Sequence, residues 1–162
     1  MMLFSYDRGA AHQYAGWSQR KSVSIDTDGI VYRRRYVIGK EDEARTVAIG
    51  CCDISCVQKV LFDFHERIAA LSENGHVNVG SHDGSFFEFV IQGKKVYAQN
   101  LNRYDLAYEK IRDEAHYNAY KAQMIASNTL WELLDALAAC VGDDVPELGL
   151  ALRCHCWISE FQ

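Results

Sequence analysis

The sequence contains six cysteines, whose side chains can bind metal ions, act as nucleophiles or pack in a core. Thiolates are good zinc ligands, and a structural zinc site takes four ligands. The candidate set is spaced as Cys-x3-Cys and Cys-x-Cys, at Cys52, Cys56, Cys154 and Cys156. The competing interpretation is core packing, because a strand would place the last two cysteines on one face with Leu150, Leu152 and Ile158. We prefer core packing and keep a zinc-stabilised domain as an alternative.

Cys56 has a second interpretation, as the nucleophile of a small cysteine-dependent enzyme. If Ser55 caps the helix that follows, Cys56 occupies the first helical position, where the helix dipole favours a thiolate. Such an enzyme also needs a base and an orienting group, and the six histidines are too scattered to identify either. A small residue at the start of a helix is the preferred interpretation.

The densest polar cluster, residues 76–84, suggests a metal-dependent hydrolase as the other enzymatic alternative. His76, His82 and Asp83 could hold an ion that activates water. Their spacing matches no ligand motif, however, and the intervening glycine, serine and asparagine are typical of a connecting loop. The sequence also lacks the glycine-rich phosphate-binding motifs and the Gly-x-Ser-x-Gly motif of serine hydrolases. We therefore expect no cofactor and no catalytic activity.

Charge and hydropathy argue against nucleic acid and membranes as partners. The formal net charge of −5 provides no positive field for a phosphate backbone or an anionic lipid surface. Arg33-Arg34-Arg35 lies between Tyr32 and Tyr36, but strand alternation divides this run between two faces. The sequence contains no secretory signal pattern and no stretch of the roughly 20 apolar residues that a membrane span needs. The expected location is the cytoplasm, where thiols are mostly reduced.

Two β-hairpins and a C-terminal strand are predicted from runs of β-branched and aromatic residues. The first hairpin joins 22–27 to 30–38 through Asp28-Gly29, and a third strand follows at 46–49. The second joins 85–91 to 94–98 through Gln92-Gly93, after a short strand around 77–79. Residues 150–158 alternate as a last strand would.

Three helices are predicted from apolar residues that recur every three or four positions. One covers 57–71, with Ser55 and Gln58 as its capping box. A second, more polar helix covers 104–126 and has a thin apolar stripe. The third covers 129–141, where Thr129 and Glu132 form another capping box.

These elements predict a single α+β domain spanning residues 1–162. Its largely antiparallel sheet is built from the two hairpins and the C-terminal strand, and helices pack on one face. Hydrophobic residues make up 49% and charged residues 24%, which is typical of globular proteins rather than disordered chains. The repeated order of hairpin and helix suggests an internal ββα duplication.

The leading functional hypothesis is a non-catalytic cytosolic protein-binding module, such as an immunity or inhibitor protein that sequesters another protein. Nine tyrosines and three tryptophans favour it, because these residue types are enriched at interfaces. A basic partner would suit the acidic chain. The predicted partner-binding residues lie on the polar helix: Tyr104, Tyr108, Glu109, Asp113, Glu114, Tyr117 and Tyr120. The alternative is that the tyrosines pack inward on the sheet.

Overall fold

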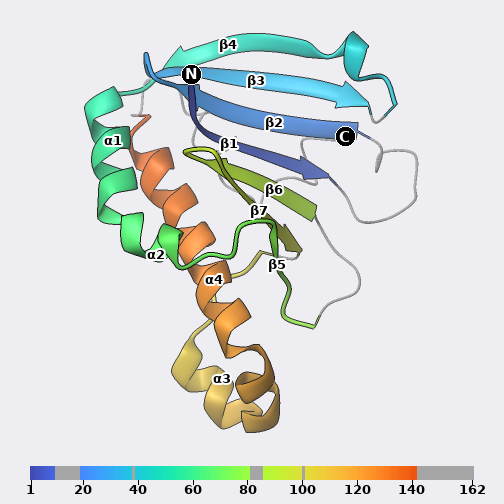
Figure 1. Ribbon diagram of the computed structural model, residues 1–162, viewed down its shortest axis with the longest axis vertical. Coiled ribbons are helices and arrows are strands. Elements are labelled where there is room, and N and C mark those ends of the chain that lie inside the picture. The colour runs from blue at the N-terminus through green and yellow to red at the C-terminus, as the bar shows by residue number, and fades with distance from the viewer. Residues whose placement is uncertain (10–18, 38, 81–85, 100, 142–162) are drawn as a thin grey trace.

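The structure is a computed structural model that describes residues 1–9, 19–37, 39–80, 86–99 and 101–141 (Figure 1). Within these residues a sheet is packed against helices, so the predicted α+β class is confirmed. The strands are β1 (Met2–Gly9), β2 (Gln19–Asp26), β3 (Ile30–Val37), β4 (Arg45–Cys51), β5 (Gly75–Val77), β6 (Phe86–Ile91) and β7 (Lys94–Gln99). The helices are α1 (Ile54–Asp63), α2 (His65–Ala69), α3 (Leu106–Arg112) and α4 (Glu114–Ala139), and a 3-10 turn, Glu41–Glu43, connects β3 to β4.

The strands form one sheet in the order β4-β3-β2-β1-β6-β7-β5. Neighbouring strands are antiparallel except β5, which runs parallel to β7. The largely antiparallel sheet is therefore confirmed. The predicted C-terminal strand and its Cys154 and Cys156 lie outside the described residues. The suggested ββα duplication stays a prediction.

Both predicted hairpins are present, and left-handed residues form their turns. Gly29 has a φ of 78° between β2 and β3, and Gly93 has a φ of 87° between β6 and β7. Gln92 precedes Gly93 with a φ of 50°, so both central residues of that turn have the positive φ of a type I′ turn. The predicted third strand is confirmed as β4.

The central strand, β1, was not predicted, although its residues alternate clearly. Phe4 and Tyr6 are completely buried, whereas Ser5 and Asp7, which alternate with them, point to the opposite face. β1 pairs with β2 on one side and with β6 on the other, so it joins the two hairpins into one sheet. β1 and β6 are far apart in the sequence, and residues 10–18 separate β1 from β2, so the local residue pattern reveals neither pairing.

Helices α1, α2 and α4 cover one face of the sheet, and the core lies between the two layers (Figure 1). The buried stripe of α4 includes Leu130, Leu133, Leu134 and Leu137, which pack in one cluster with the inward side chains of the strands. Helices on one face of the sheet are as predicted. None of the helices in the described part of the chain combines the length and apolar composition that crossing a bilayer requires.

Two predicted capping boxes are wrong. α1 is capped by Asp53, whose Oδ1 accepts from the backbone N–H of Ser55 at 2.9 Å, so Ser55 lies inside the helix. Thr129 is also internal, because its hydroxyl donates to the carbonyl of Ile125 at 3.1 Å. The helices that contain Ser55 and Thr129 are both capped by an aspartate, Asp53 and Asp113. A carboxylate at this position accepts hydrogen bonds from the free N–H groups of the first turn and interacts favourably with the helix dipole.

The helix boundaries shift accordingly. The predicted 57–71 helix is divided into α1 and α2 at Phe64. The predicted 104–126 and 129–141 helices are instead divided at Asp113, which caps α4 by accepting from the N–H of His116 at 3.0 Å. α4 continues unbroken through Thr129 because its buried stripe, from Met124 onward, needs a continuous helix to lie on the sheet.

Candidate functional site

The predicted partner-binding residues other than Tyr104 lie on a helical projection at one end of the molecule, and Tyr104 lies in the segment that leads into it. α3 packs against the first part of α4, and together they extend beyond the sheet (Figure 1). No residue of α3 is buried, and the buried residues of α4 begin only at Met124. We call α3 and residues 114–123 of α4 the helical hairpin. Its side chains contribute little to the core.

Tyr108 is the most exposed predicted tyrosine of the helical hairpin, with 58% of its surface accessible. Ile111, one turn later on α3, is 86% exposed. Residues three apart lie on the same side of a helix, so Tyr108 and Ile111 form an adjacent apolar pair that faces water. Ile111 was not predicted, because the predicted partner-binding residues were tyrosines and acidic residues only. The i,i+3 spacing from Tyr108 was the available signal.

The other three predicted tyrosines are half-buried and have local contacts. Tyr120 packs against the backbone of Gly80, where an added Cβ would come within 3.1 Å of the Tyr120 Cζ atom. Tyr120 also contacts the His116 ring, with 4.8 Å between centroids. The Lys121 ammonium lies 5.8 Å from the ring centroid of Tyr117. These contacts anchor the rings of Tyr117 and Tyr120 within the projection, whereas Tyr104 is held through its backbone.

The predicted acidic residues have different environments. Glu109 pairs with Arg112 at 2.7 Å and is largely covered. Asp113 caps α4 through its carboxylate, and Glu114 follows in the first turn. Both are exposed. Asp113 and Glu114 therefore place negative charge directly after the Tyr108 and Ile111 pair.

Two α4 side chains fix the segment that enters α3. Asn128 bonds both backbone groups of Tyr104: its Oδ1 accepts from the N–H at 2.6 Å, and its Nδ2 donates to the carbonyl at 2.9 Å. The Ser127 hydroxyl likewise bonds both backbone groups of Asn102. It accepts from the N–H at 3.0 Å and donates to the carbonyl at 2.5 Å. Ser127 is 1% exposed, so this support is internal. The base of the helical hairpin is thus held at defined positions on α4.

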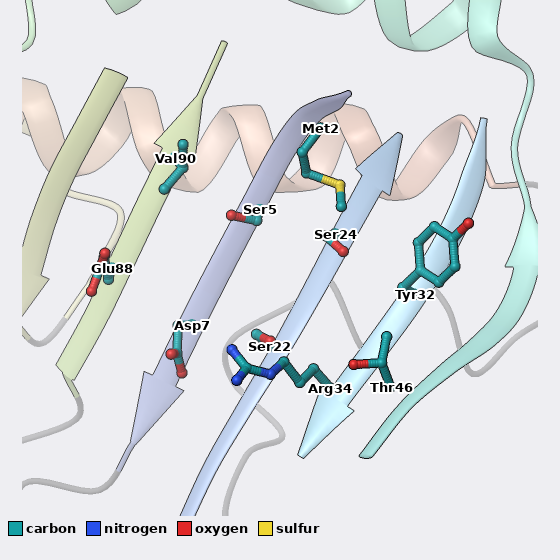
Figure 2. A pocket seen from close by; sticks show the side chains of 10 residues that line it. All are labelled: Met2, Ser5, Asp7, Ser22, Ser24, Tyr32, Arg34, Thr46, Glu88 and Val90. Atoms are coloured by element: carbon teal, nitrogen blue, oxygen red, sulfur yellow. The ribbon is translucent and has the colours of Figure 1, made fainter. Parts of the chain in front are cut away.

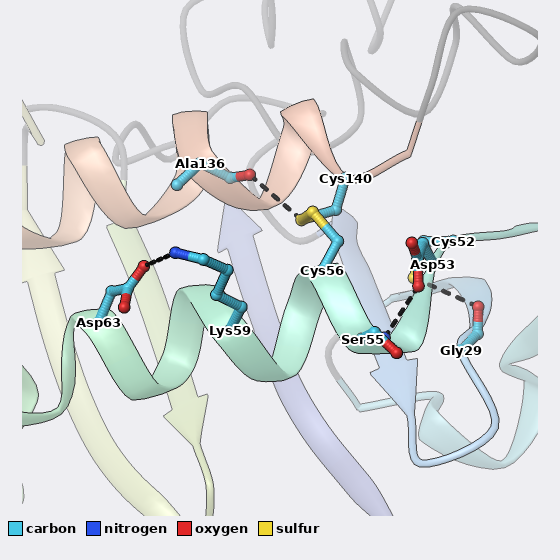
Figure 3. The surroundings of a disulfide bond; sticks show 9 residues. All are labelled: Gly29, Cys52, Asp53, Ser55, Cys56, Lys59, Asp63, Ala136 and Cys140. Carbon is cyan, nitrogen blue, oxygen red and sulfur yellow. Dashed lines mark hydrogen bonds and ion pairs between the residues drawn. A yellow bond between two sulfur atoms is a disulfide. The ribbon is translucent and has the colours of Figure 1, made fainter.

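The cysteine hypotheses are overturned at Cys56, which forms a disulfide with Cys140 (Figure 3). A bonded sulfur can be neither a nucleophilic thiolate nor a zinc ligand. Cys52 has a free thiol that donates to the carbonyl of Gly29 at 3.3 Å, and burial raises its pKa. The proposed zinc set therefore loses Cys56, and its other half, Cys154 and Cys156, lies outside the described residues.

The hydrolase alternative gains no support from the described residues. His76 is exposed on β5, and His82 and Asp83 lie outside the described residues. Across residues 1–9, 19–37, 39–80, 86–99 and 101–141, no group of three or more His, Cys, Asp or Glu side chains is arranged to hold a metal ion.

A second candidate surface lies on the sheet face opposite the helices. Arg34, Ser22, Asp7 and Glu88 are direct neighbours across four adjacent strands, because Arg34 pairs with Ser22, Ser22 with Asp7, and Asp7 with Glu88. We call this row and its surroundings the polar sheet face. Figure 2 shows the side chains standing on one side of the strands, with the guanidinium of Arg34 extending across β2 towards Ser22 and Asp7.

Asp7 has the most unusual environment on the polar sheet face. Burial raises its pKa above the ordinary value of 3.8, although a hydrogen bond from the Tyr36 hydroxyl to Oδ2 and the cation of Arg20 act in the opposite direction. Burial, together with the bond to Asp7, raises the pKa of Tyr36. Its ring also lies 4.7 Å below the guanidinium carbon of Arg34. Asp7 is therefore a carboxyl group held in place by Tyr36 on a partly covered surface.

Sequence reasoning did not single out Asp7, Arg20 or Glu88. The alternation of Phe4, Ser5, Tyr6 and Asp7 was the signal within β1, but it does not identify the neighbours of Asp7. The split of the arginine run is as predicted: Arg34 shares a face with Tyr36. Its partner across the sheet depends on strand register, which the sequence does not show.

No protein-family model matches the chain, and no curated protein or solved structure matches it either. Two surfaces of the described residues have the chemistry of a binding site, the helical hairpin and the polar sheet face.

Proposed function

We propose that this protein is a non-catalytic protein-binding module that presents the helical hairpin to a partner protein, in the manner of an inhibitor that sequesters its target. The observation that carries the proposal is the exposed pair Tyr108 and Ile111 on a helix that has no buried residue. Large apolar side chains that adjoin on a projecting element are typical of binding sites, since water contact with them is unfavourable.

Hydrogen bonds at the ends of its helices hold the helical hairpin in one conformation, which favours a role in binding. Asp105 caps α3 and Asp113 caps α4, and Asn128 bonds the backbone of Tyr104. A preorganised helix pair loses little conformational entropy on association, so more of the contact energy appears as affinity. Such a rigid projection suits insertion into a recess of another protein.

The charge around the apolar pair defines the partner. Asp113 and Glu114 are exposed and follow Ile111 closely. Their two negative charges outnumber the single positive charge of the exposed Lys110, and the whole chain has a net charge of −5. The complementary surface is an apolar recess for Tyr108 and Ile111 with basic side chains at its rim. Opposite charges at a rim mainly accelerate association and orient the two proteins.

The test is capture of partners from the native cells, followed by binding of the purified partner to variants of the protein. The double variant Tyr108→Ser/Ile111→Ser removes the apolar pair without touching the core, and we expect it to lose affinity by about tenfold or more. Phe62→Ser is the matched control, because Phe62 is 70% exposed but lies on α1. Equal losses for the control and the double variant, or full binding by the double variant, would reject the proposal.

The sequence-based expectation is a cytoplasmic location. The Cys56–Cys140 disulfide favours an oxidising compartment instead. Disulfides persist in oxidising compartments and are rare in the cytosol. Alkylation of free thiols in intact cells decides between the two. Labelled Cys56 and Cys140 would support the cytoplasm, and protected ones an oxidising compartment.

A further inference from the structure

The polar sheet face contains a trough that the protein-binding proposal does not use. A cavity of about 410 Å³ opens there, lined by side chains of β1, β2, β3, β4 and β6 (Figure 2). This volume lies within the roughly 300–1,000 Å³ of small-molecule sites. Four aliphatic hydroxyl groups border the trough, from Ser5, Ser22, Ser24 and Thr46. The trough is thus large enough for a small ligand and rich in groups that both donate and accept hydrogen bonds.

Asp7 has an acceptor that the described residues leave unused. Its Oδ2 accepts from Tyr36, but its Oδ1 is buried and has no hydrogen-bond partner within the described part of the chain. Nη1 of Arg20 is likewise buried and without such a partner, and Arg20 pairs with Tyr36 across the neighbouring strands. Buried polar groups normally find partners, because an unpaired one has lost water without replacement. Asp7, which lines the trough, therefore has an unsatisfied acceptor, and Arg20, which lies outside the lining, has an unsatisfied donor.

The charges around the trough select against ionic ligands. Asp7 and Glu88 contribute two carboxyl groups to the lining, and Arg34 contributes a guanidinium group. Glu88 is also paired with the ammonium group of Lys95 at 3.8 Å. An anion would meet the carboxyl groups, and a cation would meet Arg34. A neutral ligand with hydroxyl groups can donate to the carboxyl groups and accept from Arg34 at the same time.

The trough also has apolar walls. The ring of Tyr32 stands on β3, and Val90 stands on β6 at the other side (Figure 2). A sugar ring carries hydroxyl groups around its edge and C–H groups on its faces, so it fits a site that combines hydroxyls, charged groups and apolar surface. We infer that the trough binds a neutral saccharide, with Asp7 accepting from a sugar hydroxyl and Arg34 donating to one.

The experiment is a titration of the 15N-labelled protein with neutral sugars, followed through its backbone amide resonances. The probes are glucose, galactose, mannose, N-acetylglucosamine and their β-linked disaccharides. We expect at least one probe to shift amides of β1, β2, β3 and β6 while those of α3 stay in place. Failure of every probe to shift these amides overturns the inference, and so does a response confined to other elements.

Variants and charged probes test the chemistry of the site. Asp7→Asn and Arg34→Gln should each weaken binding by about tenfold, the typical loss of a hydrogen bond to a charged group. Arg35→Gln is the matched control, because Arg35 is the exposed next residue on β3 and points to the opposite face. If both Asp7→Asn and Arg34→Gln bind like wild type, the assigned contacts are wrong.

Glucuronate and glucosamine test the requirement for a neutral ligand. Both should bind more weakly than glucose, and tighter binding of either would overturn the neutral class. The Tyr108→Ser/Ile111→Ser variant should bind sugar like wild type. Loss of partner binding with normal sugar binding, or the reverse, thus separates failure of this inference from failure of the proposed function.

Discussion

Cys56, in the first turn of α1, is joined by a disulfide to Cys140, the residue that ends α4 (Figure 3). The two residues are 84 positions apart, and their Cα atoms are 5.6 Å apart. The bond links the two main helices that cover the sheet, and the chain between them includes β5, β6, β7 and the helical hairpin. A cross-link over so long a loop strongly restricts the unfolded chain.

We predict that the double variant Cys56→Ser/Cys140→Ser lowers the free energy of unfolding by about 2–4 kcal/mol, because the unfolded chain regains the entropy of the open loop. Urea unfolding of the purified proteins measures the loss. Cys51→Ser is the control, since Cys51 is an exposed free cysteine, and it should change stability by less than about 0.5 kcal/mol. Identical midpoints for the double variant and wild type would show that the disulfide does not contribute to stability.

Local features of the fold were predictable where one residue type determines the conformation. The turns at Gly29 and Gly93 require positive φ angles, and their glycines identified both hairpins. The buried stripes containing Leu61 and Leu133 identified the helices that lie on the core. Capping was less predictable, because Asp53 accepts from the N–H of Ser55 and so begins α1 two residues earlier than a cap at Ser55 would.

Relationships between distant residues were not predictable. Six cysteines allow 15 complete pairings, so the Cys56–Cys140 bond required the packing of α1 against α4. The neighbours Asp7 and Glu88 meet because β1 pairs with β6, across some 80 residues of intervening sequence. A single polar helix was predicted over residues 104–126, and its division at Asp113 into two packed helices was not. The exposure of Ile111 depends on where α3 lies relative to α4.

Gly29 and Gly93 should tolerate alanine differently. Both have positive φ, which costs an L-residue about 1–2 kcal/mol. An alanine Cβ at position 29 would also lie 2.6 Å from the carbonyl oxygen of Cys52, whereas position 93 has nothing within 4 Å. We expect Gly93→Ala to cost about 1 kcal/mol and Gly29→Ala about 2–4 kcal/mol, since overpacking adds to the strain. Chemical unfolding measures both changes in the free energy of unfolding. Equal changes would mean that the backbone at Cys52 moves away from the added Cβ at no cost.

Asn128 should control the order of the helical hairpin. Asn128→Ala removes both hydrogen bonds to the backbone of Tyr104 and leaves its N–H and carbonyl without these partners, at a cost of about 1–3 kcal/mol. Hydrogen exchange should then accelerate in α3 while the amides of β1 and β6 keep their protection. Asn118→Ala is the control, because Asn118 is exposed on the same helix. Unchanged exchange in α3 would show that packing alone holds the projection.

Asp7 should make the protein less stable as the pH rises, whereas most carboxylates in folded proteins have the opposite effect. Burial raises its folded-state pKa above 3.8, so the folded protein holds this proton more tightly than the unfolded chain does. The stabilising contribution is complete below pH 3.8 and is lost as the pH rises through the folded-state pKa. Asp7→Asn cannot ionise at this position, so it keeps that contribution. Its stability relative to wild type should therefore increase as the pH rises above 3.8 and then level off.

The measurement is urea unfolding of wild type and Asp7→Asn at a series of pH values. Tyr36→Phe supplies a second comparison, because loss of the hydroxyl that donates to Oδ2 removes an effect that lowers the pKa of Asp7. The side-chain carboxyl resonance of Asp7 should then titrate at higher pH than in wild type. A stability difference that stays constant or shrinks with rising pH would show that Asp7 is hydrated rather than buried, and the acceptor assigned to the trough would lose its basis.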